Sequence, residues 1–152
     1  MSAKKSGTIG LATAAIAVVL AGCGAAQAPE APSPATVRPV AGSPVPQLQL
    51  TDRAIRRLGI ATQPARMATV AIPGRRGPEE VIPYSAVIYD NDGSTWTYVN
   101  TAARTFTRER ITVVVIRGGV AVLSAGPAAG SPVVTVGAPE LLGTEYNISG
   151  EE

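Results

Sequence analysis

The chain has 152 residues and a formal net charge of +2, with no histidine, a single cysteine, Cys23, and only two lysines, Lys4 and Lys5. Beyond residue 22 neither lysine nor histidine occurs, which excludes serine–histidine–aspartate and cysteine–histidine catalysis, a Schiff-base lysine, and zinc or haem sites built from histidine. That same part carries 11 arginines against 11 acidic residues. It has no basic excess, so we expect no nucleic-acid partner.

Residues 1–22 have the composition of an export signal. Lys4 and Lys5 precede the apolar run Ile9–Leu20, which is shorter than the roughly 20 residues that span a bilayer. The run ends in Leu20-Ala21-Gly22-Cys23, which resembles the lipobox of bacterial lipoproteins. The resemblance implies cleavage before Cys23, diacylglycerol on its thiol, and an exported protein anchored on the outer face of a cell membrane. The alternatives are a plain secretory signal with an incidental cysteine, or a short membrane anchor.

Residues 23–46 have the composition of a spacer. Prolines occur at positions 29, 32, 34, 39, 44 and 46, with small residues between them and no apolar periodicity. Such a segment buries too little apolar surface to offset the entropy of ordering it. The sequence therefore predicts a disordered, Pro/Ala-rich tether over 23–46 and a folded domain over 47–152.

Beyond residue 46 the pattern is mainly β and predicts a small antiparallel barrel or sandwich with one or two short helices. The predicted strands cover 47–50, 60–72, 81–89, 95–100, 105–116, 120–124 and 133–136. Thr51 and Asp52 begin a helix that Gly59 ends, and residues 138–142 form one helical turn. Proline and glycine predict turns at 73–78, 90–93 and 118–119.

The predicted hairpin over 81–106 holds five of the six aromatic residues, which are Tyr84, Tyr89, Trp96, Tyr98 and Phe106. We expect these side chains to pack in the core and across strands. The alternative is a stacking platform for a sugar or a nucleic acid. Because no basic residue lies between Tyr84 and Tyr98, the cationic track of a nucleic-acid platform is missing.

The acidic turn Asp90-Asn91-Asp92-Gly93 is similar to a calcium loop. With Gly93 at the sixth position of such a loop, Ile88 and Val99 fall where carboxylates are required. The segment is therefore interpreted as a hairpin turn, and we expect neither a metal nor a cofactor.

Carboxylates would still allow acid–base catalysis of the glycosidase kind. The candidates in the C-terminal half are Asp90, Asp92, Glu109, Glu140 and Glu145. Their spacing singles out no pair, and a folded part of 106 residues leaves little room for a deep cleft. We expect a protein that is not an enzyme, with a carboxylate-based hydrolase as the lesser alternative.

Two groups of arginines are candidate contact residues. Arg53, Arg56 and Arg57 lie on the predicted helix, and Arg75 and Arg76 lie in the 73–78 turn. The simplest interpretation is a solvated surface, and the alternative is contact with lipid headgroups or an acidic partner.

A stretch of the folded part has a recognisable order of motifs. Residues 81–99 contain Val-Ile-Pro-Tyr-Ser-Ala-Val, an Asp-Gly turn and Trp-Thr-Tyr-Val. Residues 106–113 and 133–143 add Phe-Thr-Arg-Glu-Arg-Ile-Thr-Val and Val-Val-Thr-Val-Gly-Ala-Pro-Glu-Leu-Leu-Gly, and residues 48–63 precede them. In this order the chain resembles the membrane-proximal domain of the periplasmic adaptor subunits, or membrane fusion proteins, of resistance-nodulation-division efflux pumps.

The resemblance implies a β domain that binds a membrane transporter, here an inner-membrane resistance-nodulation-division pump. Such adaptors insert a helical hairpin, a lipoyl-like domain and most of a β-barrel where this chain has only 73–80. At 125–131 the turn before the last strand also departs from the family pattern. The implied function is that of a lipid-anchored accessory to an efflux system. The alternative is a free-standing envelope lipoprotein that binds another ligand or protein and has no pump partner.

Overall fold

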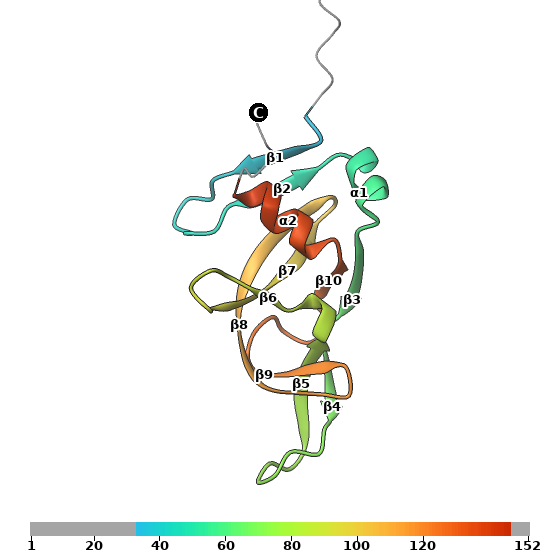
Figure 1. Ribbon diagram of the computed structural model, residues 1–152, viewed down its shortest axis with the longest axis vertical. Coiled ribbons are helices and arrows are strands. Elements are labelled where there is room, and N and C mark those ends of the chain that lie inside the picture. Colours follow the sequence, from blue (N-terminus) through green and yellow to red (C-terminus); the bar gives the residue numbers. More distant parts are fainter. Residues whose placement is uncertain (1–32, 147–152) are drawn as a thin grey trace, which may run out of the picture. The chain divides into compact units, whose positions relative to one another are not determined.

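A computed structural model describes residues 33–146, which fall in the second of two units of the chain, Pro32–Glu152 (Figure 1). The predicted signal peptide 1–22, Cys23 with its predicted lipid, and the beginning of the predicted tether lie outside the described residues. No helix within 33–146 is long and apolar enough to cross a membrane.

The elements follow one another in the order shown in Figure 1. The strands are β1 (Ala35–Arg38), β2 (Gln47–Leu50), β3 (Ala61–Pro64), β4 (Arg66–Thr69), β5 (Pro78–Pro83), β6 (Ile88–Tyr89), β7 (Thr95–Ala102), β8 (Thr105–Arg117), β9 (Val120–Ala125) and β10 (Pro132–Val136). The helices are α1 (Asp52–Leu58), α2 (Ala138–Glu145) and the short 3-10 helix η1 (Tyr84–Ala86).

The strands of the described part form one curled antiparallel sheet. The long strand β8 belongs to both halves of it, because its first residues pair with β2 and β7 and its last residues pair with β9. The sheet continues from β7 through β10 to β3, and from β9 through β5 to β4. This confirms the prediction of a mainly β, antiparallel domain with one or two short helices, and the curl gives it the form of a half-barrel.

The two ends of this strand order are neighbours in the chain. Only Ala65 lies between β3 and β4. Its N–H donates to the Ser131 carbonyl at 2.8 Å, and its carbonyl accepts from the Gly130 N–H at 2.7 Å. The continuous extended run predicted over 60–72 is therefore wrong in detail, since the chain changes partners at Ala65, pairing with β10 before it and with β5 after it.

The apolar side chains form two core clusters. One lies between the helices and strands β2, β6, β7, β8 and β10, and consists of Leu48, Leu50, Ala54, Ile88, Tyr98, Phe106, Val134, Ala138 and Leu141. The other consists of Ala65, Ile82, Ala86, Val99, Ile111, Ala121, Leu123 and Val133. Each fully buried leucine, isoleucine or valine contributes about 1.5–3 kcal/mol to stability. Both α-helices therefore depend on the first cluster for their attachment.

Helix α1 begins and ends where the sequence predicts. The Thr51 side chain accepts a hydrogen bond from the Ala54 N–H at 3.2 Å, which satisfies one of the free donors of the first turn. Gly59 adopts a left-handed conformation with φ 64° and ends the helix. Helix α2 follows Gly137, which has φ 87°, and extends to Glu145 rather than stopping after the predicted single turn.

The folded part begins before the predicted boundary at Gln47. Strand β1 pairs with β2 in antiparallel register, with Ala35 opposite Leu50 and Arg38 opposite Gln47. Val45, in the connection between the two strands, is buried. The end of the predicted tether is thus part of the sheet, because β2 offers a free edge that the short, proline-flanked strand can pair with.

The hairpin around residue 90 is confirmed, but the strand that leads into it is interrupted. The turn is closed by hydrogen bonds from the Asp90 N–H to the Ser94 carbonyl and from the Gly93 N–H to the Asp90 carbonyl, both at 2.9 Å. Between β5 and β6 the chain forms η1, so the strand predicted over 81–89 is two strands. The turn at Gly118 and Gly119 is also confirmed, and both residues have positive φ.

Candidate functional site

Arg108 occupies the centre of a polar cluster in the half of the sheet where β8 pairs with β7 and β2. It comes from β8, and its side chain is only 8% exposed. Its partners come from the β6–β7 turn, from β7 and from the end of α2. We call this group the Arg108 cluster, and it consists of Asp90, Trp96, Tyr98, Arg108, Glu145 and Tyr146.

The guanidinium of Arg108 binds two carboxylates. Nη1 donates to Asp90 Oδ2 at 2.6 Å, and Nη2 lies 3.0 Å from Glu145 Oε1. The Tyr146 hydroxyl donates to the same Asp90 oxygen at 2.8 Å, and the Tyr98 hydroxyl donates to Glu145 Oε2 at 2.5 Å. Charge-assisted hydrogen bonds of this kind are roughly twice as strong as neutral ones. The cluster therefore ties the β6–β7 turn and the end of α2 to β8.

The pKa values in the cluster follow from these contacts. The hydrogen bond from Tyr146 lowers the pKa of Asp90, and the Asn91 N–H and Arg108 lower it further. Burial, followed by the bond to Glu145, raises the pKa of Tyr98. Burial lowers the pKa of Arg108, but its bonds with Tyr146 and Asp90 outweigh this and the net pKa is raised. Asp90 is thus ionised at neutral pH and a poor proton donor.

Trp96 covers the guanidinium from one side. The Arg108 carbon Cζ lies 4.3 Å from the centre of the Trp96 ring, within the range of a cation–π contact. The indole N–H donates to Ser94 Oγ at 2.7 Å, which holds the ring over the turn. The prediction that these aromatic residues pack in the core and across strands is confirmed for Tyr98 and Phe106, which are buried, and for Trp96, which is half-buried, packs against the first core cluster and also contacts Arg108.

Of the five carboxylates considered for hydrolysis, Asp90 and Asp92 share one turn, and the structure brings Asp90 and Glu145 together from distant parts of the chain. Arg108 lies between them. Asp92 binds the backbone and hydroxyl of Ser94 within its own turn. Burial raises the pKa of Glu109, and the nearby charge of Glu80 adds to this. No group of three or more potential metal ligands occurs among residues 33–146.

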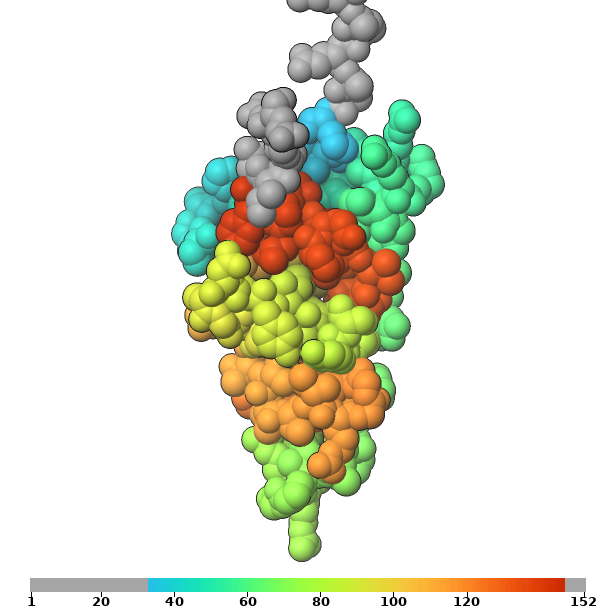
Figure 2. Space-filling view, viewed as in Figure 1, coloured from blue at the N-terminus to red at the C-terminus, as the bar shows by residue number. Residues whose placement is uncertain are grey.

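A shallow hollow of about 310 Å³ lies beside the Arg108 cluster, between η1, β6 and α2. Its lining is mainly apolar and includes Val87, Ile88, Pro139 and Leu142. Figure 2 shows the segment with η1 and β6, in yellow-green, lying directly against α2, in red. The two walls are held by the Arg108 cluster, because Asp90 follows β6 immediately and Glu145 is the last residue of α2.

Two tyrosines beside this hollow contradict the core prediction. Tyr84 is 44% exposed and Tyr89 is 54% exposed. The neighbouring Tyr84 hydroxyl, followed by burial, raises the pKa of Tyr89. Tyr89 belongs to the two-residue strand β6, which points it away from the buried Ile88. We call the hollow together with Tyr84 and Tyr89 the aromatic hollow.

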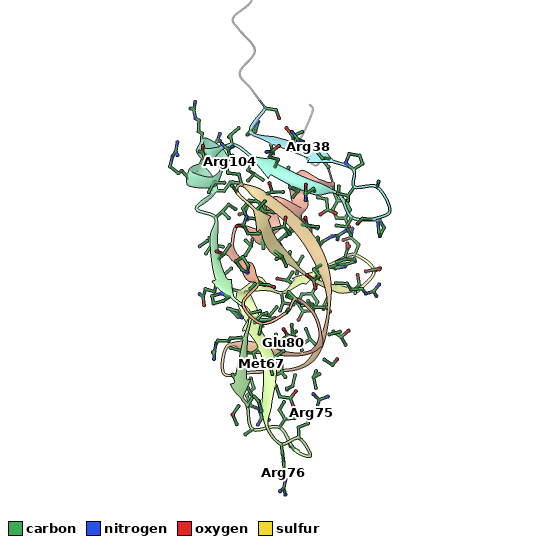
Figure 3. The ribbon with its side chains drawn as sticks, turned by 180° about the vertical axis from the view of Figure 1, so that it is seen from behind. Arg38, Met67, Arg75, Arg76, Glu80 and Arg104 are labelled. Carbon is green, nitrogen blue, oxygen red and sulfur yellow. The ribbon has the colours of Figure 1, made fainter. Side chains whose placement is uncertain are left out.

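The predicted contact arginines lie in two separate places. Arg53, Arg56 and Arg57 are exposed on α1, and no ion pair holds them within the described residues. Arg75 and Arg76 lie in the β4–β5 turn, where Arg75 pairs with Glu79 at 3.0 Å. Figure 3 shows these two at the end of the unit remote from β1 and β2. The structure therefore does not join the five arginines into one surface.

The sequence predicts neither the aromatic hollow nor the Arg108 cluster. Arg108 stands in a strand with an ordinary alternating pattern, and its partners lie 18 residues before it and well beyond it in the chain. The interruption of the strand by η1, which turns Tyr84 outward, follows Pro83, and that proline was the one available signal. Comparisons with protein-family models, with curated proteins and with solved structures found no significant match to this chain.

Proposed function

We propose that this protein is a lipid-anchored, extracytoplasmic accessory protein that binds a membrane transport protein of an efflux system through the aromatic hollow. The observation that carries the proposal is the hollow itself. Exposed tyrosines beside a preformed apolar depression are typical of the anchor residues that dominate protein–protein interfaces. In this view the protein contributes a docking surface and no catalysis.

The position of the hollow in the sequence supports the assignment to transport. Tyr84 and Tyr89 lie within 81–99, the stretch that resembles the membrane-proximal domain of efflux adaptors. Pro139 and Leu142 lie within 133–143, a second stretch of the same resemblance. The segments that carry the resemblance therefore also form the surface.

A lipid anchor at Cys23 would allow a weak contact to hold the protein on its transporter. A tether converts binding into an event within one membrane plane and raises the local concentration of the partner, without requiring a large interface. A small surface such as the aromatic hollow is then enough for association with a transporter in the same membrane.

The test is mild crosslinking of intact cells, followed by detergent extraction, pull-down through a C-terminal tag and mass spectrometry. Wild type should recover a membrane transport protein, and both Cys23→Ser and Tyr89→Ser should recover much less of it. Val136→Ser is the matched control, because Val136 is also an exposed apolar residue, at 51%, but does not line the hollow.

Recovery of no transporter by folded, well-expressed wild type would overturn the proposal and favour the free-standing envelope lipoprotein. Equal recovery by wild type and Tyr89→Ser would leave a transporter partner but exclude the aromatic hollow as its binding surface.

A further inference from the structure

The end of the unit that carries β1, β2 and α1 has an excess of positive charge. Among residues 35–58, which form β1, β2 and α1, the only acidic residue is Asp52, while α2, which contacts β1 and β2, adds Glu140 and the Arg108-paired Glu145. Asp52 pairs with Arg104 at 3.0 Å, an exposed arginine from the β7–β8 turn. Arg38 on β1 lies at this same end (Figure 3). We call the exposed residues Arg38, Arg53, Arg56, Arg57 and Arg104 the basic end.

The chain enters the folded unit at the basic end. The Thr51 N–H donates to the Pro34 carbonyl at 3.0 Å, which places the start of β1 beside the first turn of α1. Ser33 lines a depression of about 410 Å³ together with Asp52, Arg53 and Arg104. The connection toward Cys23 therefore begins next to the arginines of α1.

The length of that connection limits how far the basic end can be from an anchor. Ser33 lies ten residues beyond Cys23. A fully extended chain covers at most about 3.6 Å per residue, so the two are never more than about 36 Å apart. A tether that extended to residue 46 would let the folded unit lie much farther from Cys23. Residues 35–46 belong to the fold, so this longer distance is not available.

We propose that the basic end binds the anionic phospholipid surface of the membrane in which Cys23 is anchored, so that lipid and arginines form a two-point attachment. This inference rests on the lipid anchor of the proposed function and adds the headgroup chemistry and the contacting face. The two chains of a diacylglycerol on Cys23 would already hold the protein on the membrane, and the arginines would add an electrostatic contact that fixes which face of the domain meets the lipid. Each arginine near such a surface raises the docked population about fivefold.

Arginine is suited to this contact for two reasons. Its planar guanidinium binds phosphate oxygens in a bidentate manner, and it stays charged at every physiological pH. The three arginines of α1 carry no competing carboxylate within the described residues, whereas Arg75 at the other end is paired with Glu79. Salt screens such contacts over about 8–10 Å, so the docked state should be sensitive to ionic strength.

The experiment uses the mature lipoprotein, purified from membranes and reconstituted into vesicles without any transporter. One set of vesicles is phosphatidylcholine alone, and the other contains about one third phosphatidylglycerol. Amide hydrogen exchange is followed by mass spectrometry in low and high salt. We expect exchange in α1 to slow about tenfold on the anionic vesicles in low salt, and to return to the neutral-vesicle rate in high salt.

Charge variants assign the effect to the basic end. The triple variant Arg53→Glu, Arg56→Glu, Arg57→Glu should lose the protection, and Arg75→Glu with Arg76→Glu should keep it. Equal exchange of wild-type α1 on the two kinds of vesicle, or protection that survives the triple reversal, would overturn the proposal.

The result of the vesicle experiment can be distinguished from the result of the pull-down that tests the proposed function. The vesicles hold no transporter, so a failed pull-down leaves this result unaffected. The intact mass reports whether Cys23 carries lipid. If it does not, sedimentation with the same vesicles still tests the arginines, which then predict salt-sensitive binding to anionic vesicles alone, lost in the triple variant.

Discussion

Arginine occupies two contrasting settings in this molecule. On α1 three arginines point into solvent without a described ion pair, whereas Arg108 lies in the sheet with two carboxylates and an indole ring around it. The exposed group stands out in the sequence as a charge run, and the buried one does not. Exposed charges gain little from their neighbours, while a buried charge becomes costly as soon as its partners are removed.

The difference follows from where the partners lie in the chain. The neighbours of Arg56 and Arg57 are set by local helix geometry. Arg108 instead collects a carboxylate from a hairpin turn and another from the last residue of α2. How much an arginine contributes to stability therefore depends on its tertiary contacts, which the sequence pattern does not show.

The largest effect is expected from Arg108→Met. The substitution leaves the Asp90 and Glu145 carboxylates beside a thioether, and loss of one partner costs about 3–5 kcal/mol for a fully buried ion pair and less for a partly buried one such as this. The free energy of unfolding, measured by urea denaturation, should fall by about 2–3 kcal/mol. Arg110→Met is the control, because Arg110 is exposed and has no ion pair in the described structure, so its effect should stay below about 0.5 kcal/mol. Equal losses in the two variants would contradict the assigned role of Arg108.

The contrast also explains how much of the fold was predictable. The strand over 105–116 and the hairpin at 90–93 follow from alternation and turn residues that act locally. The sequence does not predict strand β1, because four residues between prolines pair only when β2 is already in place. The change of partner at Ala65 depends in the same way on contacts with Gly130 and Ser131.

The candidate site was less predictable than the fold. The sequence marks residues 81–99 as important through their resemblance, but it places Tyr84 and Tyr89 in the core. Both are exposed because η1 breaks the alternation between β5 and β6. A single turn of 3-10 helix thus converts a predicted strand face into part of a surface.

The junction between α1 and α2 gives the next largest effect. Gly137 has φ 87°, and a Cβ atom there would meet the terminal methyl group of Ile60, just after α1. Gly137→Ala should lower the free energy of unfolding by about 1–2 kcal/mol, chiefly from the left-handed backbone. Gly143→Ala is the matched control within α2, since nothing lies near its Cβ position, and it should raise stability by about 0.5–1 kcal/mol. The same sign in both variants would refute the backbone argument.

A smaller effect is expected at the start of α1. Thr51→Ala removes the acceptor of the Ala54 N–H and should cost about 1 kcal/mol. Thr51→Ser keeps a hydroxyl in place and should retain most of that stability. Urea denaturation gives the global value, and amide exchange of α1 shows whether the loss is local. A Thr51→Ser variant as unstable as Thr51→Ala would assign the effect to the lost methyl group instead.

The smallest effect on stability should come from the arginines of α1. Here the exposed arginines should differ most clearly from the largely buried Arg108. Arg53→Gln, Arg56→Gln and Arg57→Gln remove exposed charges that have no described partner, so each should change the free energy of unfolding by less than about 0.5 kcal/mol. The neutral triple variant should nevertheless lose the protection of α1 on anionic vesicles. A large loss of stability would show that these residues support the fold, and their charge could then no longer be assigned to a membrane contact. Loss of the membrane contact with stability unchanged is the pattern that a docking surface requires, and it is the opposite of the pattern expected at Arg108.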